Sequence, residues 1–105
     1  MTLTACQSEP APRPLTPEQS AALTPEDARL ARLYEQSCKS CHTAKDTGAP
    51  MTGDPTQWNL RWEKGEAELL KSAVGGLRGM PAGGQCFSCT AKDHKELIRF
   101  MAGRE

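Results

Sequence analysis

The stretch QSCKSCHTA, residues 36–44, places Cys38 and Cys41 three residues apart, with His42 directly after the second cysteine. Thioredoxin-like redox pairs, zinc knuckles and covalent haem sites all use Cys-x-x-Cys, but only the haem site requires histidine as the next residue. On a helix the two thiols lie on one face, where both can bond to one porphyrin. The motif therefore predicts a covalently attached haem, with Cys38 and Cys41 as attachment points and His42 as an iron ligand.

Three other interpretations of the motif compete with haem. A structural cysteine pair leaves His42 without a role, and a redox dithiol normally follows a strand, which this sequence does not predict. Zinc is the stronger alternative, because Cys86 and Cys89 form a second Cys-x-x-Cys and four thiolates can make a closed tetrahedral site. Zinc would leave both His42 and the sequence Met80-Pro81 unexplained, so the haem interpretation is favoured.

The composition limits the possible functions of the chain. It has 105 residues, 13 basic and 13 acidic side chains, and only 5% aromatic residues. A net charge of zero argues against a nucleic-acid partner, which usually requires a basic surface. A core with so few large side chains usually needs a disulfide, a metal or a large cofactor. No apolar run approaches the roughly 20 residues of a membrane-spanning helix.

The order of local signals predicts a tether followed by one helical domain. Residues 1–24 contain four prolines and few large apolar groups, which is typical of an extended spacer. At about 3 Å per residue, the part from Gln7 to Thr24 could reach roughly 50 Å. Residues 25–105 show helical periodicity and no strand pattern. We expect an all-α domain of about four helices wrapped around one haem.

Capping signals place the four helices. Thr24 and Pro25 suit the start of a helix that runs to about His42. A second helix is expected from Asp54 through Trp62, and a third in the stretch GEAELLKSAVGG, residues 65–76. Thr90 and Asp93 form a capping-box pattern at the start of the last helix, which Gly103 ends.

Met80 is the best candidate for a second axial ligand. It lies 38 residues after His42 in an irregular segment fixed by Pro81, which is enough chain to reach the opposite face of a haem. A thioether ligand raises the reduction potential of the iron. Met51 is too close to His42 in sequence to cross to that face, and Met101 fits the core stripe of the last helix. His94 is an alternative ligand on the same stripe.

Several segments together resemble the cytochrome c5 family of class I c-type cytochromes. They are CxxCH, the spaced pattern GAP…GD…W…R in residues 48–61, the stretch GMPAGGQCFSCT in residues 79–90, and the amphipathic last helix. The resemblance covers roughly residues 28–102. It implies the small class I cytochrome fold, a single haem c, and a one-electron carrier instead of an enzyme. A haem subunit of a redox enzyme is the alternative.

The resemblance also implies roles for individual residues. Cys38 and Cys41 would form thioether bonds, with His42 as the proximal and Met80 as the distal ligand. The carbonyl of Pro50 would accept the histidine ring N–H. Further implied features are haem packing by Trp58, a propionate contact from Arg61, a disulfide between Cys86 and Cys89, and an aromatic contact between Tyr34 and Phe100.

The stretch LTAC, residues 3–6, resembles the lipobox of a bacterial lipoprotein, so Cys6 is a lipidation candidate. No charged and apolar leader precedes it in this sequence. Attachment of haem to CxxCH implies export, and we expect the bacterial periplasm, with membrane anchoring through Cys6. The expected partners are an electron donor and an acceptor, such as membrane oxidase or reductase complexes. The protein is expected to be a monomer.

Overall fold

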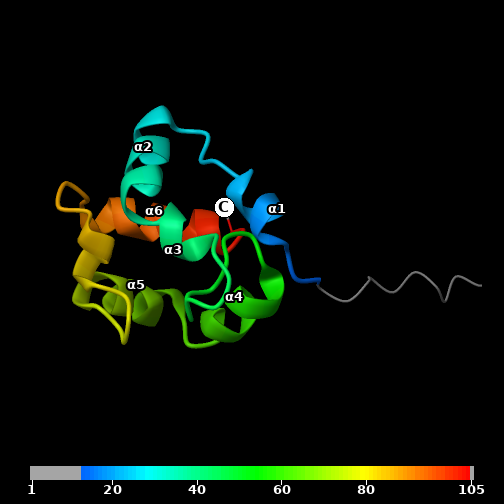
Figure 1. Ribbon diagram of the computed structural model, residues 1–105. Helices are drawn as coiled ribbons and strands as arrows, with labels where there is room; N and C mark the ends of the chain where they lie inside the picture. Colours follow the sequence, from blue (N-terminus) through cyan, green and yellow to red (C-terminus); the bar gives the residue numbers. More distant parts are fainter. Residues whose placement is uncertain (1–12, 105) are drawn as a thin grey trace, which may run out of the picture.

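Helices make up most of the described chain, residues 13–104 of a computed structural model (Figure 1). Within these residues the extended pairing is limited to an isolated bridge between Leu77 and Met80, and no helix has both the length and the apolar character to cross a bilayer. The predicted all-α fold is confirmed, with six α-helices in place of about four. They are α1 Pro17–Ala21, α2 Ala28–Ser37, α3 Lys39–His42, α4 Pro55–Trp62, α5 Glu66–Gly75 and α6 Ala91–Met101, with a 3₁₀ helix at Ala82–Gln85.

The helix α2 begins three residues later than its sequence suggested. Its N-cap is Asp27, whose carboxylate accepts a hydrogen bond from the Leu30 amide at 3.0 Å. A carboxylate also interacts favourably with the positive end of the helix dipole, which a threonine hydroxyl does not. Pro25 is buried ahead of the helix instead of occupying its first position. The predicted cap at Thr24 is therefore wrong.

The helix predicted to run to His42 is divided at Cys38, which ends α2 and precedes α3. The backbone hydrogen bonds continue through the break. The Cys38 amide donates to the Tyr34 carbonyl at 2.9 Å, and the Cys38 carbonyl accepts from the His42 amide at 3.1 Å. The break is therefore a kink, and the CxxCH motif keeps its helical register.

The remaining helices form where the local signals predicted them. The Asp54 carboxylate caps α4. The helix α5 ends just before Gly76, which has φ +90°, a conformation that glycine adopts without strain. Thr90 and Asp93 form the predicted reciprocal capping box at the start of α6. These three helices are specified by residues next to their own ends.

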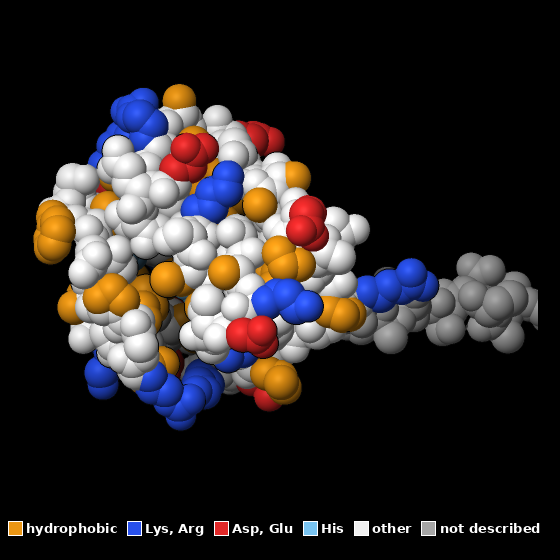
Figure 2. Space-filling model, viewed as in Figure 1, with side chains coloured by type: hydrophobic (Ala, Val, Ile, Leu, Met, Phe, Trp, Pro, Cys, Tyr) orange, Lys and Arg blue, Asp and Glu red, His pale blue; other side chains and the backbone are white. Residues whose placement is uncertain are grey.

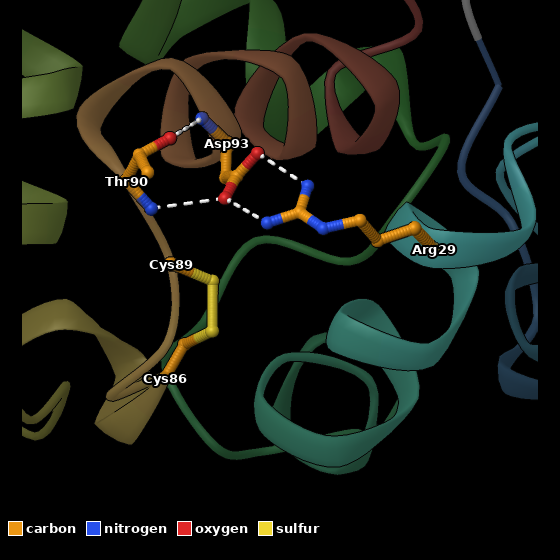
Figure 3. The surroundings of a disulfide bond; sticks show 5 residues. All are labelled: Arg29, Cys86, Cys89, Thr90 and Asp93. Atoms are coloured by element: carbon orange, nitrogen blue, oxygen red, sulfur yellow. Dashed lines mark hydrogen bonds and ion pairs between the residues drawn. A yellow bond between two sulfur atoms is a disulfide. The ribbon is translucent and has the colours of Figure 1, made fainter.

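One hydrophobic core joins α2 to α6. Tyr34 and Leu97 are 0% and 2% exposed, and the Tyr34 ring meets Phe100 edge-on with centroids 5.0 Å apart, the predicted aromatic contact. Arg29 and Asp93 join the same two helices through two hydrogen bonds of 2.9 and 2.8 Å (Figure 3). The other core residues are Leu33, Trp58, Ala73, Cys86, Ile98, Met101 and Ala102.

The segment that precedes α2 lies against the body of the protein, although the sequence predicted a tether over residues 1–24. Thr16 and Gln19 form a capping box around α1. Ser20 is completely buried, and its hydroxyl donates to the Thr52 carbonyl at 2.8 Å. This segment is therefore part of the folded domain and differs from the predicted tether. The first twelve residues lie outside the described part of the chain.

Candidate functional site

The short helix α3 and its N-cap carry the three residues of the CxxCH motif. Cys38 is half-buried, Cys41 is exposed, and both thiols are free. Burial raises the pKa of the Cys38 thiol to about 11, so this thiol is protonated at neutral pH. His42 is buried. Two unpaired thiols and an imidazole are thus gathered within about one helical turn.

The loop after α3 orients the imidazole of His42. The Nδ1 atom lies 2.7 Å from the carbonyl oxygen of Pro50. Because a carbonyl oxygen only accepts, Nδ1 carries the proton and Nε2 carries the lone pair that a metal ion requires. Burial lowers the pKa of His42, an effect partly opposed by the bond to Pro50, and the ring is neutral at pH 7. The contact that the resemblance assigned to Pro50 is present in the structure.

The indole of Trp58 packs against the same imidazole. The two rings are stacked, with centroids 5.9 Å apart and planes inclined by 23°. The buried indole N–H donates to the Met51 carbonyl at 2.9 Å. Trp58 therefore joins α4 to the loop that orients His42. Met51 belongs to this loop, and its expected place on the His42 side of a haem stays a prediction.

Arg61 lies in the last turn of α4 and is half-buried. Its guanidinium donates to the Gln57 carbonyl at 2.8 Å. Its positive charge also contributes to the lowered pKa of His42, which places it in the neighbourhood of the imidazole. The propionate contact of Arg61 stays a prediction.

Met80 lies in the segment between α5 and α6, half-buried against the core. A tight turn precedes it, in which Leu77 and Met80 exchange backbone hydrogen bonds of 3.0 and 2.8 Å around Arg78, at φ +53°. A Cβ added at Gly84 would lie 3.6 Å from the Ser37 carbonyl oxygen and 3.8 Å from the Met80 methyl carbon. Both distances are ordinary van der Waals contacts, so the segment around Gly84 lies beside the end of α2, next to the CxxCH motif.

Cys86 and Cys89 are joined by a disulfide just before α6 (Figure 3). Their sulfur atoms are therefore not available as thiolate ligands. Within residues 13–104, no group of three or more His, Cys, Asp or Glu side chains is placed to hold a metal ion. The structure does not support the four-cysteine zinc site that the sequence left open.

Comparison with known proteins adds to this geometry. Residues 25–101 match the family described as cytochrome c oxidase, cbb3-type, subunit III. The chain belongs to this family of c-type cytochromes. It is 35% identical over 73 residues to cytochrome c5 of Ectopseudomonas mendocina, which covers 68% of this chain and 84% of the relative. It is 38% identical over 77 residues to cytochrome c-555 of Prosthecochloris aestuarii, and the match covers 66% of this chain and 78% of the relative. For cytochrome c-555 of Chlorobaculum tepidum the identity is 31% over 75 residues, and the match covers 68% of this chain and 69% of the relative.

This cytochrome is of the c5-like class I type, and the family match implies a covalently attached haem c. The residues of the site fit that group, since they supply two unpaired thiols, a neutral imidazole with an available Nε2, and a thioether on a nearby segment. Figure 2 shows a hollow on the face where Figure 1 places α3, α5 and the segment after α5. All three relatives are cytochromes.

Sequence reasoning missed the polar residues that hold the loop between α3 and α4 of this cytochrome. The Tyr34 hydroxyl donates to the Thr52 hydroxyl at 2.9 Å, and Ser20 donates to the Thr52 carbonyl. Nothing local marks Thr52. Ser20 had a usable signal, because Thr16 and Gln19 match the capping-box pattern with proline at the first helical position.

Proposed function

We propose that this cytochrome carries single electrons between redox proteins, with haem c bound to Cys38 and Cys41 and with His42 and Met80 as axial ligands. The observation that supports this most strongly is the state of His42. Its ring is buried, its Nδ1–H is bound to the Pro50 carbonyl, and its Nε2 is left for iron beside two unpaired thiols. Haem c, when bound, supplies an iron ion that gains and loses one electron.

The surrounding residues have distinct tasks in this proposal. The Pro50 carbonyl keeps the proton on Nδ1 and makes Nε2 a stronger electron donor. Trp58 keeps the imidazole plane in place by stacking and shields it from water. The Met80 sulfur would favour the reduced state of a bound haem, and Arg61 would pair with one of its propionates. If His42 and Met80 both hold the iron, the protein would leave no position for a substrate, as expected for a carrier.

The proposed partners are an electron donor and an acceptor, including membrane oxidase or reductase complexes. Exposed apolar side chains mark the segment around Met80, where Leu77 is 50% exposed and Phe87 is 96% exposed. Such a surface, with the exposed cation of Arg78 beside it, suits small transient contacts between redox proteins. We further propose a monomer in the bacterial periplasm. The lipidation candidate Cys6 lies outside the described residues.

Optical spectroscopy of protein matured with c-type machinery tests this proposal. Met80→Ala should abolish the weak band near the red end of the ferric spectrum that reports a sulfur–iron bond, whereas Met51→Ala, the matched control, should retain it. Persistence of the band in Met80→Ala would assign the sulfur ligand elsewhere. A five-coordinate wild-type spectrum would favour a haem enzyme subunit. A pale protein with the mass of the bare polypeptide would overturn the whole proposal.

A further inference from the structure

The N-terminal segment Leu15–Leu23, which we call the strap, contacts the loop that follows His42. The Leu15 amide donates to the Asp54 carboxylate at 3.2 Å. In the middle of the strap, the buried Ser20 hydroxyl donates to the Thr52 carbonyl at 2.8 Å and lies 3.4 Å from the His42 carbonyl. The strap thus reaches both ends of the loop that runs from His42 to Asp54.

Apolar contacts add to these hydrogen bonds at Gly53. Gly53 has φ +82°, and a Cβ added there would collide with the Leu23 side chain and lie 3.0 Å from the Leu15 methyl carbon. The strap therefore covers the backbone of the loop closely. The backbone of Gly53 is also bound to α6, because its amide donates to the Met101 carbonyl at 2.7 Å.

The backbone held by the strap is the backbone that orients the His42 ring. The Thr52 amide donates to the His42 carbonyl at 2.7 Å, which closes the loop on itself. Pro50, whose carbonyl binds His42 Nδ1, lies two residues before Thr52. A shift of Thr52 would therefore move the Pro50 carbonyl relative to the ring.

The strap is stable only because it is docked. The helix α1 has five residues, far fewer than the roughly 12–15 that an isolated helix needs in water. Its capping box and first-position proline favour the helical conformation. Burial of Ser20 and the contacts to the loop must supply the rest.

We propose that the strap fixes the loop after His42 and that Ser20 is a positioning residue for the His42 imidazole. The inference rests on the proposed role of His42 as an iron ligand. Ser20 acts through the backbone: it holds the Thr52 carbonyl, which keeps the Pro50 carbonyl against Nδ1. When haem is bound, a firmly held Nδ1–H···O=C bond increases electron donation by the ring and favours the oxidised state.

Hydrogen exchange of the wild-type, haem-loaded protein tests docking of the strap without any substitution. The Ser20 amide, which donates to the Thr16 carbonyl at 3.0 Å, should exchange at least about tenfold more slowly than in an unstructured peptide. Exchange of the Ser20 amide at the rate of an unstructured peptide would overturn the proposal that the strap is docked. This result is independent of the haem proposal, which fails separately if the protein carries no covalent haem.

The variant Ser20→Ala tests positioning. It removes the hydroxyl donor to a buried carbonyl, so exchange of the Thr52 and Gly53 amides should accelerate roughly tenfold or more. The His42 Nδ1–H signal in NMR spectra of the reduced protein should exchange faster, and the reduction potential should rise. Ser88→Ala, at an exposed serine, should change none of these. A lowered unfolding midpoint with the Nδ1–H signal and potential unchanged would make Ser20 merely structural and overturn its positioning role.

A second variant keeps the positioning proposal testable if Ser20→Ala does not fold. Leu23→Ala trims a partly exposed side chain from the strap without removing a polar group. It should accelerate exchange of the Gly53 amide and raise the reduction potential, as Ser20→Ala should. Leu60→Ala, at a 65% exposed leucine of α4, is the matched control. Equal effects of Leu23→Ala and Leu60→Ala would contradict the proposal.

Discussion

At the scale of single residues, the site depends on buried polar atoms that are paired across the loop after His42. The Met51 carbonyl accepts from the Trp58 indole, and the Pro50 carbonyl accepts from His42. Each bond contributes little by itself, but a buried group left without its partner is costly. At Trp58 and His42, the hydrogen-bonding group of the side chain therefore matters more than the size of the side chain.

Trp58→Phe tests this at one bond. The variant keeps an aromatic ring beside His42 but removes the donor to the buried Met51 carbonyl, and it should lower the free energy of unfolding by about 2 kcal/mol. Denaturant unfolding of the haem-loaded protein measures the change. Trp62→Phe is the control. The Arg104 guanidinium carbon lies over the Trp62 ring, 4.6 Å from the ring centroid, and phenylalanine also presents a ring face to this cation. Equal losses in the two variants would contradict the argument.

The sequence predicts those site residues that are close together in the chain. Cys38, Cys41 and His42 form one motif, and their helical register follows from their spacing. The contact between Ser20 and Thr52 could not be predicted in this way, because the two residues are 32 positions apart and meet only when the strap folds onto the loop. Contacts of this kind depend on tertiary packing, which leaves no local pattern.

At the scale of helices, the start of α2 shows how two candidate caps compete. Thr24 and Asp27 both have side chains that can cap a helix, and both precede the apolar stripe. Asp27 is used, and its carboxylate binds the Leu30 amide. At α4 and α6 the predicted caps, Asp54 and Thr90, are the ones that the structure uses. The strap was missed because its prolines were interpreted as a tether.

Paired alanine variants distinguish the two caps. Asp27→Ala removes the hydrogen bond to the first turn of α2 and should lower the free energy of unfolding by about 1 kcal/mol. Thr24→Ala removes an exposed side chain outside the helix and should change it by less than about 0.5 kcal/mol. Chemical denaturation of both variants measures these values. A larger loss for Thr24→Ala would mean that the helix starts at Thr24 in solution.

At the scale of the whole molecule, two helices that are far apart in the sequence are joined where α2 meets α6. The Arg29 guanidinium beside Asp93 holds the pKa of that carboxyl well below its usual range, assisted by the Thr90 backbone amide. The folded state therefore favours the charged carboxylate. Its contribution to stability is complete above the ordinary aspartate pKa of about 4 and is lost as the pH falls toward the lowered value.

The acid dependence of unfolding checks this junction. The difference in the free energy of unfolding between wild type and Asp93→Asn should be largest near neutral pH and should shrink progressively below about pH 4. Arg29→Gln, which removes the other partner, should show the same trend. Arg32→Gln, at an exposed position of the same helix, should differ little from wild type at any pH. A difference for Asp93→Asn that stays constant down to low pH would contradict the assignment.

The bond from the Leu15 amide to Asp54 also has a mechanical consequence for a lipid-bearing Cys6. Leu15 lies nine residues after Cys6 in the sequence, and covalent geometry limits the span between them to about 30 Å. A chain that were free as far as Thr24 could reach roughly 50 Å. The segment between Cys6 and Leu15 is therefore short. If Cys6 carries lipid, electron exchange would be restricted to complexes whose docking faces lie within a thin layer above the bilayer.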